Sequence, residues 1–465
     1  MKLPLVLLLL LLSNRLLAQD CDCAAEFEYV KSYYEQNSPA FPKIKDDPQA
    51  YKQYQGKVKQ LGKAVANEKT PDRCSLYLEQ YVELLKDHHS GIGFNLKRQE
   101  IDFSDEGQLK SFKASEAYQA FRKIPIDTLK VKAGLSSRKP DEVEGIYTNS
   151  ANLQIGIIKQ KKDTYLGVVL RKTKLLDVGH VLLELKQKDA DTFEGVYHLG
   201  LLGYNFQHLY KEVEVKDGRI SQFNFYKPDF KREQHEKPYA FKELDAQTNY
   251  IRLSDFDGGL KEELDTFYES IAEKLSSKPF LVIDLRDNGG GDERCYLGLL
   301  PYLYTKPLVI DDVEVWVSPE NIRRYEEQGS GKSTPLLERM KQAQPYSFIP
   351  LAENAANTWE LDSVTVYPKK VAVLFNRNTA SSAEGMITYA MQSDKVVTVG
   401  ENSGGYIGYG NVMQARTPCG KYIIGCTTTK YTNKSKYEYV GIEPMYKPAA
   451  KHDWVEYAQS LFQNL

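Results

Sequence analysis

The sequence predicts a layered α/β core in the C-terminal half of the chain, preceded by a helical region and a small antiparallel β domain. Three observations support this class. Apolar residues recur at helical spacing up to about residue 120, apolar and polar residues alternate from about 140 to 230, and strands alternate with helices from about 245. Strands that alternate with helices form a sheet covered by helices. We therefore divide the chain into residues 1–18, 19–125, 126–240 and 241–465.

The first 18 residues have the pattern of a secretory signal peptide. Lys2 precedes an almost unbroken apolar run, and the small Ala18 precedes Gln19. The run is short and lies at the very start of the chain, and no later segment has the length of a membrane span. We expect an exported protein, periplasmic or extracellular. A lipid anchor on Cys21 is less favoured, because Asp20 stands where a small residue should precede a lipidated cysteine.

The overall charge of the chain is nearly balanced. A formal net charge of −2 becomes −4 when Lys2 and Arg15 leave with the leader. This balance argues against nucleic acid and anionic membrane surfaces as partners.

The six cysteines suggest disulfides, which export permits. Cys419 and Cys426 flank a predicted hairpin and could pair across it, and Cys74 could pair with Cys21 or Cys23. The cysteines and histidines lack the spacing of metal ligands. We therefore expect neither a metal nor an organic cofactor.

The helical region ends in a segment that carries two histidines. Its last helix starts at Pro71 and places Tyr77, Leu78 and Tyr81 on one face. The helix must end before Gly91, which leaves the residues of "DHHS" (87–90) at its C-terminal edge. In the β domain that follows, stretches such as "NLQIGIIKQKKDTYLGVVL" alternate between turn signals and predict a barrel or a sandwich.

The core begins with a strand near residue 250 and an amphipathic helix, "GLKEELDTFYESIAEKL". The buried strand "PFLVIDLR" then leads into the glycine run Gly289–Gly291. Consecutive glycines can turn their N–H groups toward one negative oxygen, although an ordinary flexible turn is the alternative. The strand "KVAVLF" leads into "NRNTASSAEGM", where Ser381 lies near a helix N-terminus. A nucleophile would benefit from the positive end of the helix dipole, and simple helix capping is the alternative.

Together these segments resemble a known family. "IDLRDNGGG", "NRNTASSAEG", "VGENSGG" and "YVGIEP", in this order, are similar to the motifs of the tail-specific (C-terminal processing) serine peptidases, which include the tricorn core. The resemblance covers roughly residues 245 to 450, and extends more weakly to "LLKDHHSG". It implies a crotonase- or Clp-protease-like α/β core with Ser381 as nucleophile. The oxyanion donors would be the backbone N–H groups of Ser382 and of Gly289 or Gly290.

The family uses two kinds of general base. The processing peptidases use a lysine shortly after the "VGE" strand, and Tyr406 stands at that place here. The tricorn-like branch uses a histidine of the N-terminal region, which His89 matches, with His88 as the competing choice. An acidic residue near the Gly-Ile-x-Pro element supports the histidine in this branch. Glu438 falls there, and Glu443 is the competing choice.

The chemistry of this set is coherent. A serine hydroxyl needs a base to accept its proton, and a histidine base needs a partner that fixes its tautomer. Glu438 could orient His89 directly or through the hydroxyl of Ser90. The sequence therefore predicts a secreted serine endopeptidase acting on peptides or proteins. A homologue that only binds peptides or hydrophobic ligands in the same cleft is the rival hypothesis, and hydrolysis of non-peptide esters or amides is a third.

Overall fold

The computed structural model describes most of the chain. The described residues are 21–68, 71–94, 102, 104–119, 121–139, 142–149, 152–198, 207–228, 230, 237–329, 331, 333–353, 358–362, 364–449 and 452–463. The expected leader at residues 1–18 lies outside them. Over these ranges, no helix combines the length and apolar character needed to cross a membrane.

The N-terminal region is helical, as predicted. Asp22 and Asp47 accept hydrogen bonds from the first backbone N–H groups of two helices and so fix where they begin. Phe27, Tyr34 and Tyr81 pack in the core between the helices. The helical elements before the β domain are α1 (Cys23–Asn37), α2 (Phe41–Lys45), α3 (Pro48–Val65), α4 (Pro71–Val82), η1 (Glu83–Leu85), α5 (Glu106–Ala114), α6 (Glu116–Gln119) and α7 (Thr128–Ser136).

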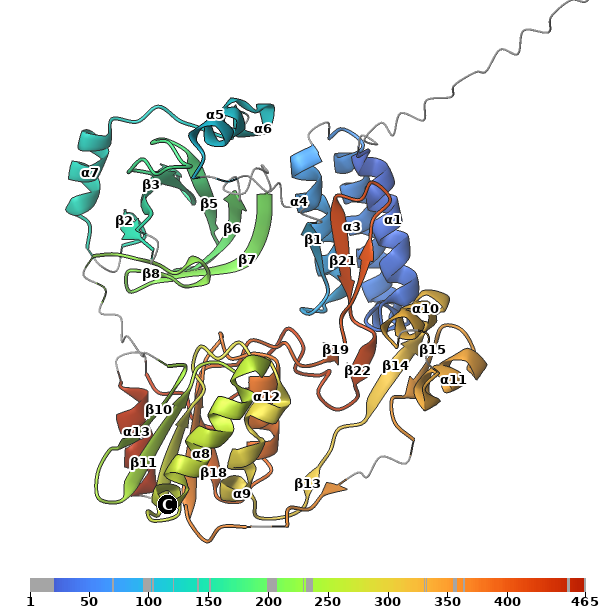
Figure 1. The fold of residues 1–465 in the computed structure, drawn as a ribbon, viewed down its shortest axis with the longest axis vertical. Helices are drawn as coiled ribbons and strands as arrows, with labels where there is room; N and C mark the ends of the chain where they lie inside the picture. Colours follow the sequence, from blue (N-terminus) through green and yellow to red (C-terminus); the bar gives the residue numbers. More distant parts are fainter. Residues whose placement is uncertain are drawn as a thin grey trace, which may run out of the picture.

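The β domain is a closed antiparallel barrel rather than a sandwich (Figure 1). Pairing of Thr148 with Tyr226 joins its first and last strands. Tyr147, Ile155 and Phe193 belong to its packed apolar interior. Its strands are β2 (Gly145–Thr148), β3 (Gln154–Lys161), β4 (Thr164–Val169), β5 (Val181–Gln187), β6 (Thr192–His198), β7 (Gln207–Lys216), β8 (Arg219–Ile220) and β9 (Phe225–Tyr226), with η3 (Ser221–Phe223) between the last two.

The C-terminal core is the predicted layered α/β structure. Its sheet has the order β10-β11-β12-β17-β18, in which β10 (Tyr239–Glu243) is antiparallel to β11 and the remaining pairs are parallel. The parallel strands are β11 (Thr248–Leu253), β12 (Phe280–Asp284), β17 (Lys370–Phe375) and β18 (Val396–Gly400). One face packs against α8 (Lys261–Leu275), α9 (Leu300–Leu303) and α12 (Ser382–Ala390), and the other against α13 (Trp454–Phe462). Single turns η4 (Gly258–Leu260), η5 (Glu293–Cys295) and η6 (Leu297–Leu299) complete this part.

Two further sheets connect the core to the N-terminal region. In the first, β1 (Gly91–Phe94) pairs with β21 (Tyr422–Cys426), which pairs with β20 (Met413–Arg416). The second has the order β15-β14-β22-β19. Its strands are β14 (Val313–Val317), β15 (Ser347–Pro350), β19 (Tyr409–Gly410) and β22 (Thr429–Tyr431). Helices α10 (Pro319–Gln328) and α11 (Pro335–Gln342) and the pair β13 (Leu308–Val309) and β16 (Thr358–Trp359) lie within the same excursion from the core.

Two disulfides hold the N-terminal segment in place. Cys23 pairs with Cys74, which is one of the two alternatives left open by the sequence. The expected pairing of Cys419 with Cys426 is wrong, because Cys419 pairs with Cys21 and Cys426 is a buried free thiol. The sequence could not reveal this pairing, since it depends on α1 packing against the β20–β21 hairpin.

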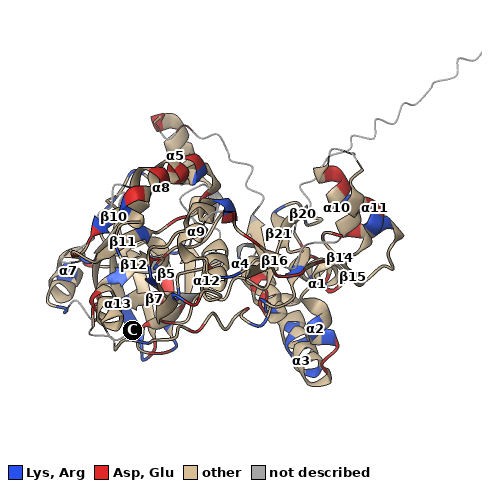
Figure 2. Ribbon diagram, turned by 90° about the horizontal axis from the view of Figure 1, so that it is seen from below, with Lys and Arg blue, Asp and Glu red and all other residues tan. Residues whose placement is uncertain are grey.

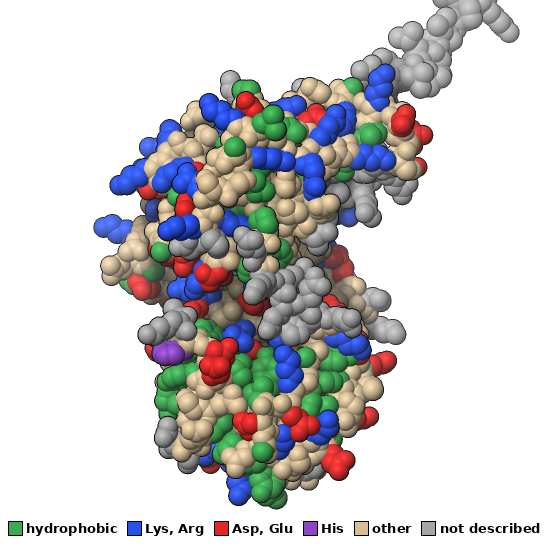
Figure 3. Space-filling view, turned by 90° about the vertical axis from the view of Figure 1, so that its left-hand side faces the viewer, with side chains coloured by type: hydrophobic (Ala, Val, Ile, Leu, Met, Phe, Trp, Pro, Cys, Tyr) green, Lys and Arg blue, Asp and Glu red, His purple; other side chains and the backbone are tan. Residues whose placement is uncertain are grey.

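Charge is distributed without a dominant sign. Figure 2 shows basic and acidic residues interspersed along the helices of the chain. Figure 3 shows that the molecule narrows between an upper lobe that holds the barrel and a lower lobe that holds the α/β core.

Candidate active site

Ser381 occupies a strained turn between β17 and α12. Its backbone has φ 55° and ψ −122°, a region that costs a non-glycine residue roughly 1–3 kcal/mol. The N–H of Ser381 donates to Oε2 of Glu384, at 2.9 Å. A strained turn from a buried strand into a helix exposes a side chain at the helix N-terminus, which suits a nucleophile.

The Glu384 carboxylate is the polar centre of this turn. It is fully buried and accepts four hydrogen bonds, two on each oxygen. Besides Ser381, the donors are the hydroxyl of Ser403 at 2.6 Å and the backbone N–H groups of Gly405 and Tyr406 at 2.8 and 2.7 Å. Burial raises the pKa of Glu384, and these four donors oppose that rise. The sequence analysis missed this role, although a serine followed three residues later by glutamate is the spacing of a capping box.

The glycine loop after β12 is tied to the serine turn. The hydroxyl of Thr379 donates to the Leu285 carbonyl and the N–H of Ala380 donates to the Asn288 carbonyl, both at 2.9 Å. Gly290, with φ 93°, lies so close that a Cβ there would stand 2.7 Å from Cβ of Ser381. Only glycine fits this approach.

The two expected glycine donors of an oxyanion hole differ. The N–H of Gly290 donates to Oδ1 of Asn288 at 2.9 Å, so this group is already engaged. Gly289 is exposed, and its N–H has no hydrogen-bond partner among the residues that the structure describes. Of the two, Gly289 is therefore the available donor.

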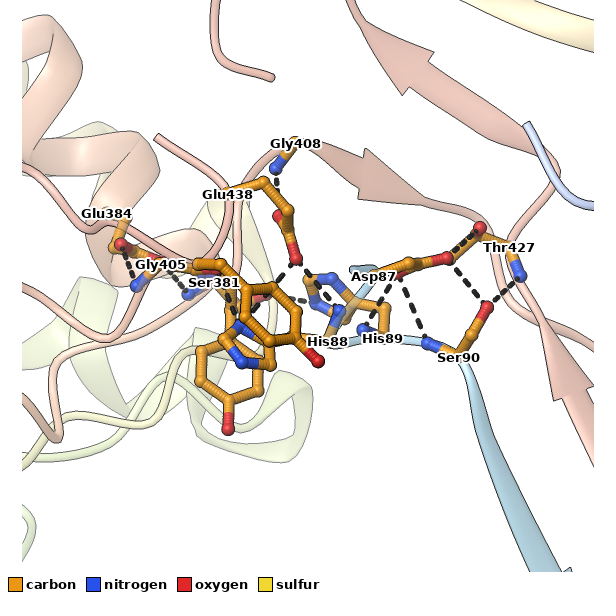
Figure 4. A network of polar contacts seen from close by, with 12 residues as sticks. Asp87, His88, His89, Ser90, Ser381, Glu384, Gly405, Gly408, Thr427 and Glu438 are labelled. Atoms are coloured by element: carbon orange, nitrogen blue, oxygen red, sulfur yellow. Dashed lines mark hydrogen bonds and ion pairs between the residues drawn. The ribbon is translucent and has the colours of Figure 1, made fainter. Parts of the chain in front are cut away.

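His89 reaches the serine from the other end of the chain. The pairing of β1 with β21 brings residues 87–90 against the core, and Nε2 of His89 lies 3.2 Å from Oγ of Ser381 (Figure 4). Asp87 fixes this segment: it accepts from the N–H groups of His89 and Ser90, and from the hydroxyls of Ser90 and Thr427 at 2.6 and 2.5 Å. The sequence analysis did not predict Asp87 or Thr427.

The His89 ring lies in a site that favours its neutral form. Burial lowers its pKa, and the nearby Asp87 carboxylate only partly opposes this effect. Nδ1 of His89 is buried and has no hydrogen-bond partner within the described part of the chain. The carboxylate of Asp87 bonds to the backbone of His89 and not to its ring.

His88 has a different environment from His89. Its ring is stacked between Tyr406 and Tyr439, with centroid distances of 4.1 and 3.6 Å, and Nδ1 lies 2.8 Å from the Gly405 carbonyl. Burial lowers its pKa to about 4, so the ring is neutral at physiological pH. Tyr406, which stands where the processing peptidases have lysine, thus packs on a histidine.

Glu438 does not contact the His89 ring. Its Oε1 accepts from the backbone N–H of His88 at 2.8 Å, and its Oε2 from that of Gly408 at 2.6 Å (Figure 4). Burial raises the pKa of Glu438 to about 7, despite these two donors. The expectation that it orients the His89 ring directly is therefore wrong.

The two remaining candidates also lie elsewhere. The Ser90 hydroxyl donates to Asp87 and does not bridge Glu438 to His89. Glu443 is exposed and pairs with Lys447 at 2.7 Å. Across the described ranges, no group of three or more histidine, cysteine or acidic side chains is arranged to hold a metal ion.

Comparison with known proteins relates the part of the chain that contains Ser381 to a peptidase family. Residues 247–447 match the model of peptidase family S41. No curated protein matched the chain. The matched range includes Ser381, the glycine loop and Glu438, whereas His89 lies outside it.

Solved structures of peptidases resemble the chain only distantly. A peptidase from Parabacteroides merdae has 18% identity over 49% of this chain and 65% of its own, with a TM-score of 0.33. An S41 protease from Bacteroides fragilis has 11% identity over 94% and 97%, with a TM-score of 0.38. The tricorn protease has 11% identity over 95% and 37%, with a TM-score of 0.40. Since these scores are below 0.5, the assignment depends on the family model. Residues 247–447 of this chain constitute a domain of peptidase family S41, the tail-specific serine peptidase family.

Proposed function

We propose that the protein hydrolyses peptide bonds with Ser381 as nucleophile and His89 as general base. The 3.2 Å distance from Nε2 of His89 to Oγ of Ser381 is the observation that carries this proposal. In the first half-reaction His89 takes the proton of Ser381 as the serine attacks the carbonyl carbon, and then passes it to the leaving amine. In the second, His89 takes a proton from the water that attacks the acyl carbon, the bond from that carbon to Oγ of Ser381 breaks, and His89 returns the proton to Oγ.

The oxyanion of each tetrahedral intermediate would be bound by the backbone N–H groups of Ser382 and Gly289. Ser382 is the first residue of α12, where backbone N–H groups lack partners within the helix and the dipole favours negative charge. Gly289 contributes a donor from the loop that is tied to the serine turn. Gly290 acts instead through its small size, by letting this loop approach Ser381.

Positioning of His89 would come from two carboxylates. Asp87 holds the backbone of the segment that carries His89. Glu438 binds the N–H of His88 and the N–H of Gly408, and so joins this segment to the loop after β18. Glu438 therefore supports His89 through the backbone, and the ring of His88 fills the space between two tyrosines.

We propose endopeptidase activity rather than aminopeptidase activity. An aminopeptidase needs a free carboxylate that binds the terminal ammonium group of the substrate. Asp87, Glu384 and Glu438, the carboxylates around Ser381 and His89, each accept hydrogen bonds from the protein itself. None of these three carboxylates is therefore left to bind a terminal ammonium group.

We further propose that the protein is exported to the periplasm or the cell exterior. Two disulfides, Cys21–Cys419 and Cys23–Cys74, suit an oxidising compartment. They agree with the leader expected from the sequence. Because Cys21 is in a disulfide, its thiol is not available for a lipid anchor.

Labelling of the purified protein with a fluorophosphonate probe, followed by peptide mapping, tests the catalytic proposal. We expect one adduct, on Ser381. The label should be lost in Ser381→Ala and in His89→Ala, and kept in the surface control His452→Ala. A folded protein that takes no label, or an adduct that survives in His89→Ala at the wild-type rate, would contradict the proposal.

A further inference from the structure

One hairpin of the barrel contacts both parts of the chain that build the site. The first contact is with the helix that leads to His89. The backbone N–H of Leu209, in β7, donates to Oε2 of Glu79 at 2.7 Å. Glu79 is only 7% exposed and lies on α4, which continues through η1 to Asp87 and His89. Strand β7 packs directly against this helix.

The second contact is with the loop that carries Gly289. Arg219, in β8, places a guanidinium nitrogen 3.6 Å from Oδ2 of Asp287. The other oxygen of Asp287 accepts from the side-chain amides of Asn376 and Asn378, at 3.1 and 2.8 Å. Burial alone would raise the pKa of Asp287, but these amides and the charges of Arg219 and Arg252 lower it, so the carboxylate is ionised.

Asp287 thus links three segments. It directly precedes Asn288 and Gly289, and its amide partners belong to the loop that leads to Ser381. Its remaining oxygen faces the barrel. A shift of the barrel at Arg219 would therefore act on the donor loop and on the serine turn together.

The two contact points are rigidly connected within the barrel. Strands β7 and β8 are paired through Val215 with Ile220 and Lys216 with Arg219. Leu209 is paired with Val196 of β6, and the barrel interior is packed with apolar side chains.

We propose that the β7–β8 hairpin is a brace that sets the position of His89 relative to Ser381, with Glu79 and Arg219 as its positioning residues. This inference rests on the proposed catalytic roles of Ser381 and His89. One end of the brace holds the helix that carries the base, and the other holds the loops that carry the nucleophile and the Gly289 donor. The barrel is then part of the catalytic architecture and not a passive insertion.

A brace has a characteristic response to mutation. Changes at distant, independent sites normally multiply in their effect on a rate. If the hairpin connects the two halves, loss of either end disconnects it, and loss of the second end changes nothing more. The effect of Glu79→Ala and Arg219→Ala together should therefore equal that of the more severe single variant.

The test measures the rate of labelling of Ser381 by the fluorophosphonate, with kcat and KM on a cleaved peptide. The part-exposed Arg219–Asp287 ion pair contributes little by itself, and Glu79 holds the barrel through the backbone N–H of Leu209. We therefore expect each single variant to lower the rate about two- to fivefold, with KM within twofold of wild type. Glu79→Gln keeps an oxygen that can accept from Leu209, and Arg219→Lys keeps the charge, so both should recover most of the rate. Arg122→Ala removes a similarly part-exposed ion pair, with Glu184 of β5, and is the matched control.

A second readout does not depend on activity. Hydrogen exchange of the backbone amides at residues 86–90 and 286–291 should be faster in both alanine variants and unchanged in Arg122→Ala. The brace would be refuted if the effects of the two single variants multiply in the double variant. It would also be refuted if hydrogen exchange in the alanine variants is no faster than in Arg122→Ala. Absence of labelling in the wild-type protein would instead refute the catalytic proposal, and hydrogen exchange would still decide on the brace.

Discussion

Replacement of Glu384 by glutamine should destabilise the serine turn far more than the loss of one charge suggests. Each oxygen of Glu384 accepts two hydrogen bonds from the protein, and one of the four donors is the N–H of Ser381. A glutamine side chain has a single oxygen. Its NH₂ group would face two donors, whichever way the amide is turned.

The magnitude follows from these contacts. A hydrogen bond to a charged acceptor contributes about 1.5–3 kcal/mol, and a buried donor left unpaired costs about 1–3 kcal/mol. The Ser403 hydroxyl can rotate and accept from the amide, which reduces the loss on that side. We expect Glu384→Gln to lower the free energy of unfolding by about 2–4 kcal/mol. The turn at Ser381 should also relax, because the hydrogen bond that opposes its strain is weakened, so labelling should fall about tenfold or more.

Urea unfolding followed by circular dichroism measures the first effect, and fluorophosphonate labelling of the still-folded protein measures the second. Glu443→Gln is the matched control, since Glu443 is exposed and pairs with the exposed Lys447. Its unfolding free energy should stay within about 0.5 kcal/mol of wild type. A Glu384→Gln variant as stable and as reactive as this control would refute the role that we assign to the buried carboxylate.

Three further outcomes are expected. Gly290→Ala should abolish labelling of Ser381 in a protein that still folds, because a Cβ would stand 2.7 Å from Cβ of the serine and φ is 93°; retained labelling would contradict the close approach. The labelling rate should rise with pH to a plateau and exceed half of it at pH 6.5, because burial lowers the pKa of His89 and the base acts in its neutral form; a midpoint above pH 6.5 would contradict this. For Glu438, burial raises the pKa in the folded protein to about 7 from an ordinary 4.5. The free energy of unfolding of the wild-type protein should therefore fall as the pH rises from 4.5 to 7, and this contribution should stay constant above pH 7. The unfolding free energy of Glu438→Gln relative to wild type should therefore increase by up to roughly 3 kcal/mol between pH 4 and 8; a constant difference would count against the shift.

The elements that carry Ser381 and Gly289 could be predicted from the sequence, because both depend on local patterns. A run of apolar residues followed by small and glycine residues indicates a buried strand that ends in a loop. Both strands are present, as β12 and β17, and each leads into the predicted loop. The motif also placed His89 correctly in the segment that meets the serine, although the residue is almost 300 positions away.

The partners of these residues could not be predicted, because they depend on how distant segments pack. Glu438 was expected to orient the His89 ring, directly or through the Ser90 hydroxyl, yet it accepts a hydrogen bond from the backbone N–H of His88. Asp87 and Thr427 meet only through the pairing of β1 with β21. Nothing in the sequence near either residue indicates this contact.

The sequence by itself determined the layered core, the helical region, the β domain and the location of Ser381, since periodicity and turn residues act over a few positions. The tertiary structure decided that the β domain closes as a barrel, that Cys21 pairs with Cys419, and that the N–H of Gly290 is engaged while that of Gly289 is available. It also decided that the barrel contacts both halves of the site, at Glu79 and at Asp287. The physical reason is the same in each case: local propensities set the conformation of a segment, whereas the partner of a buried polar group is chosen by packing between segments far apart in the chain.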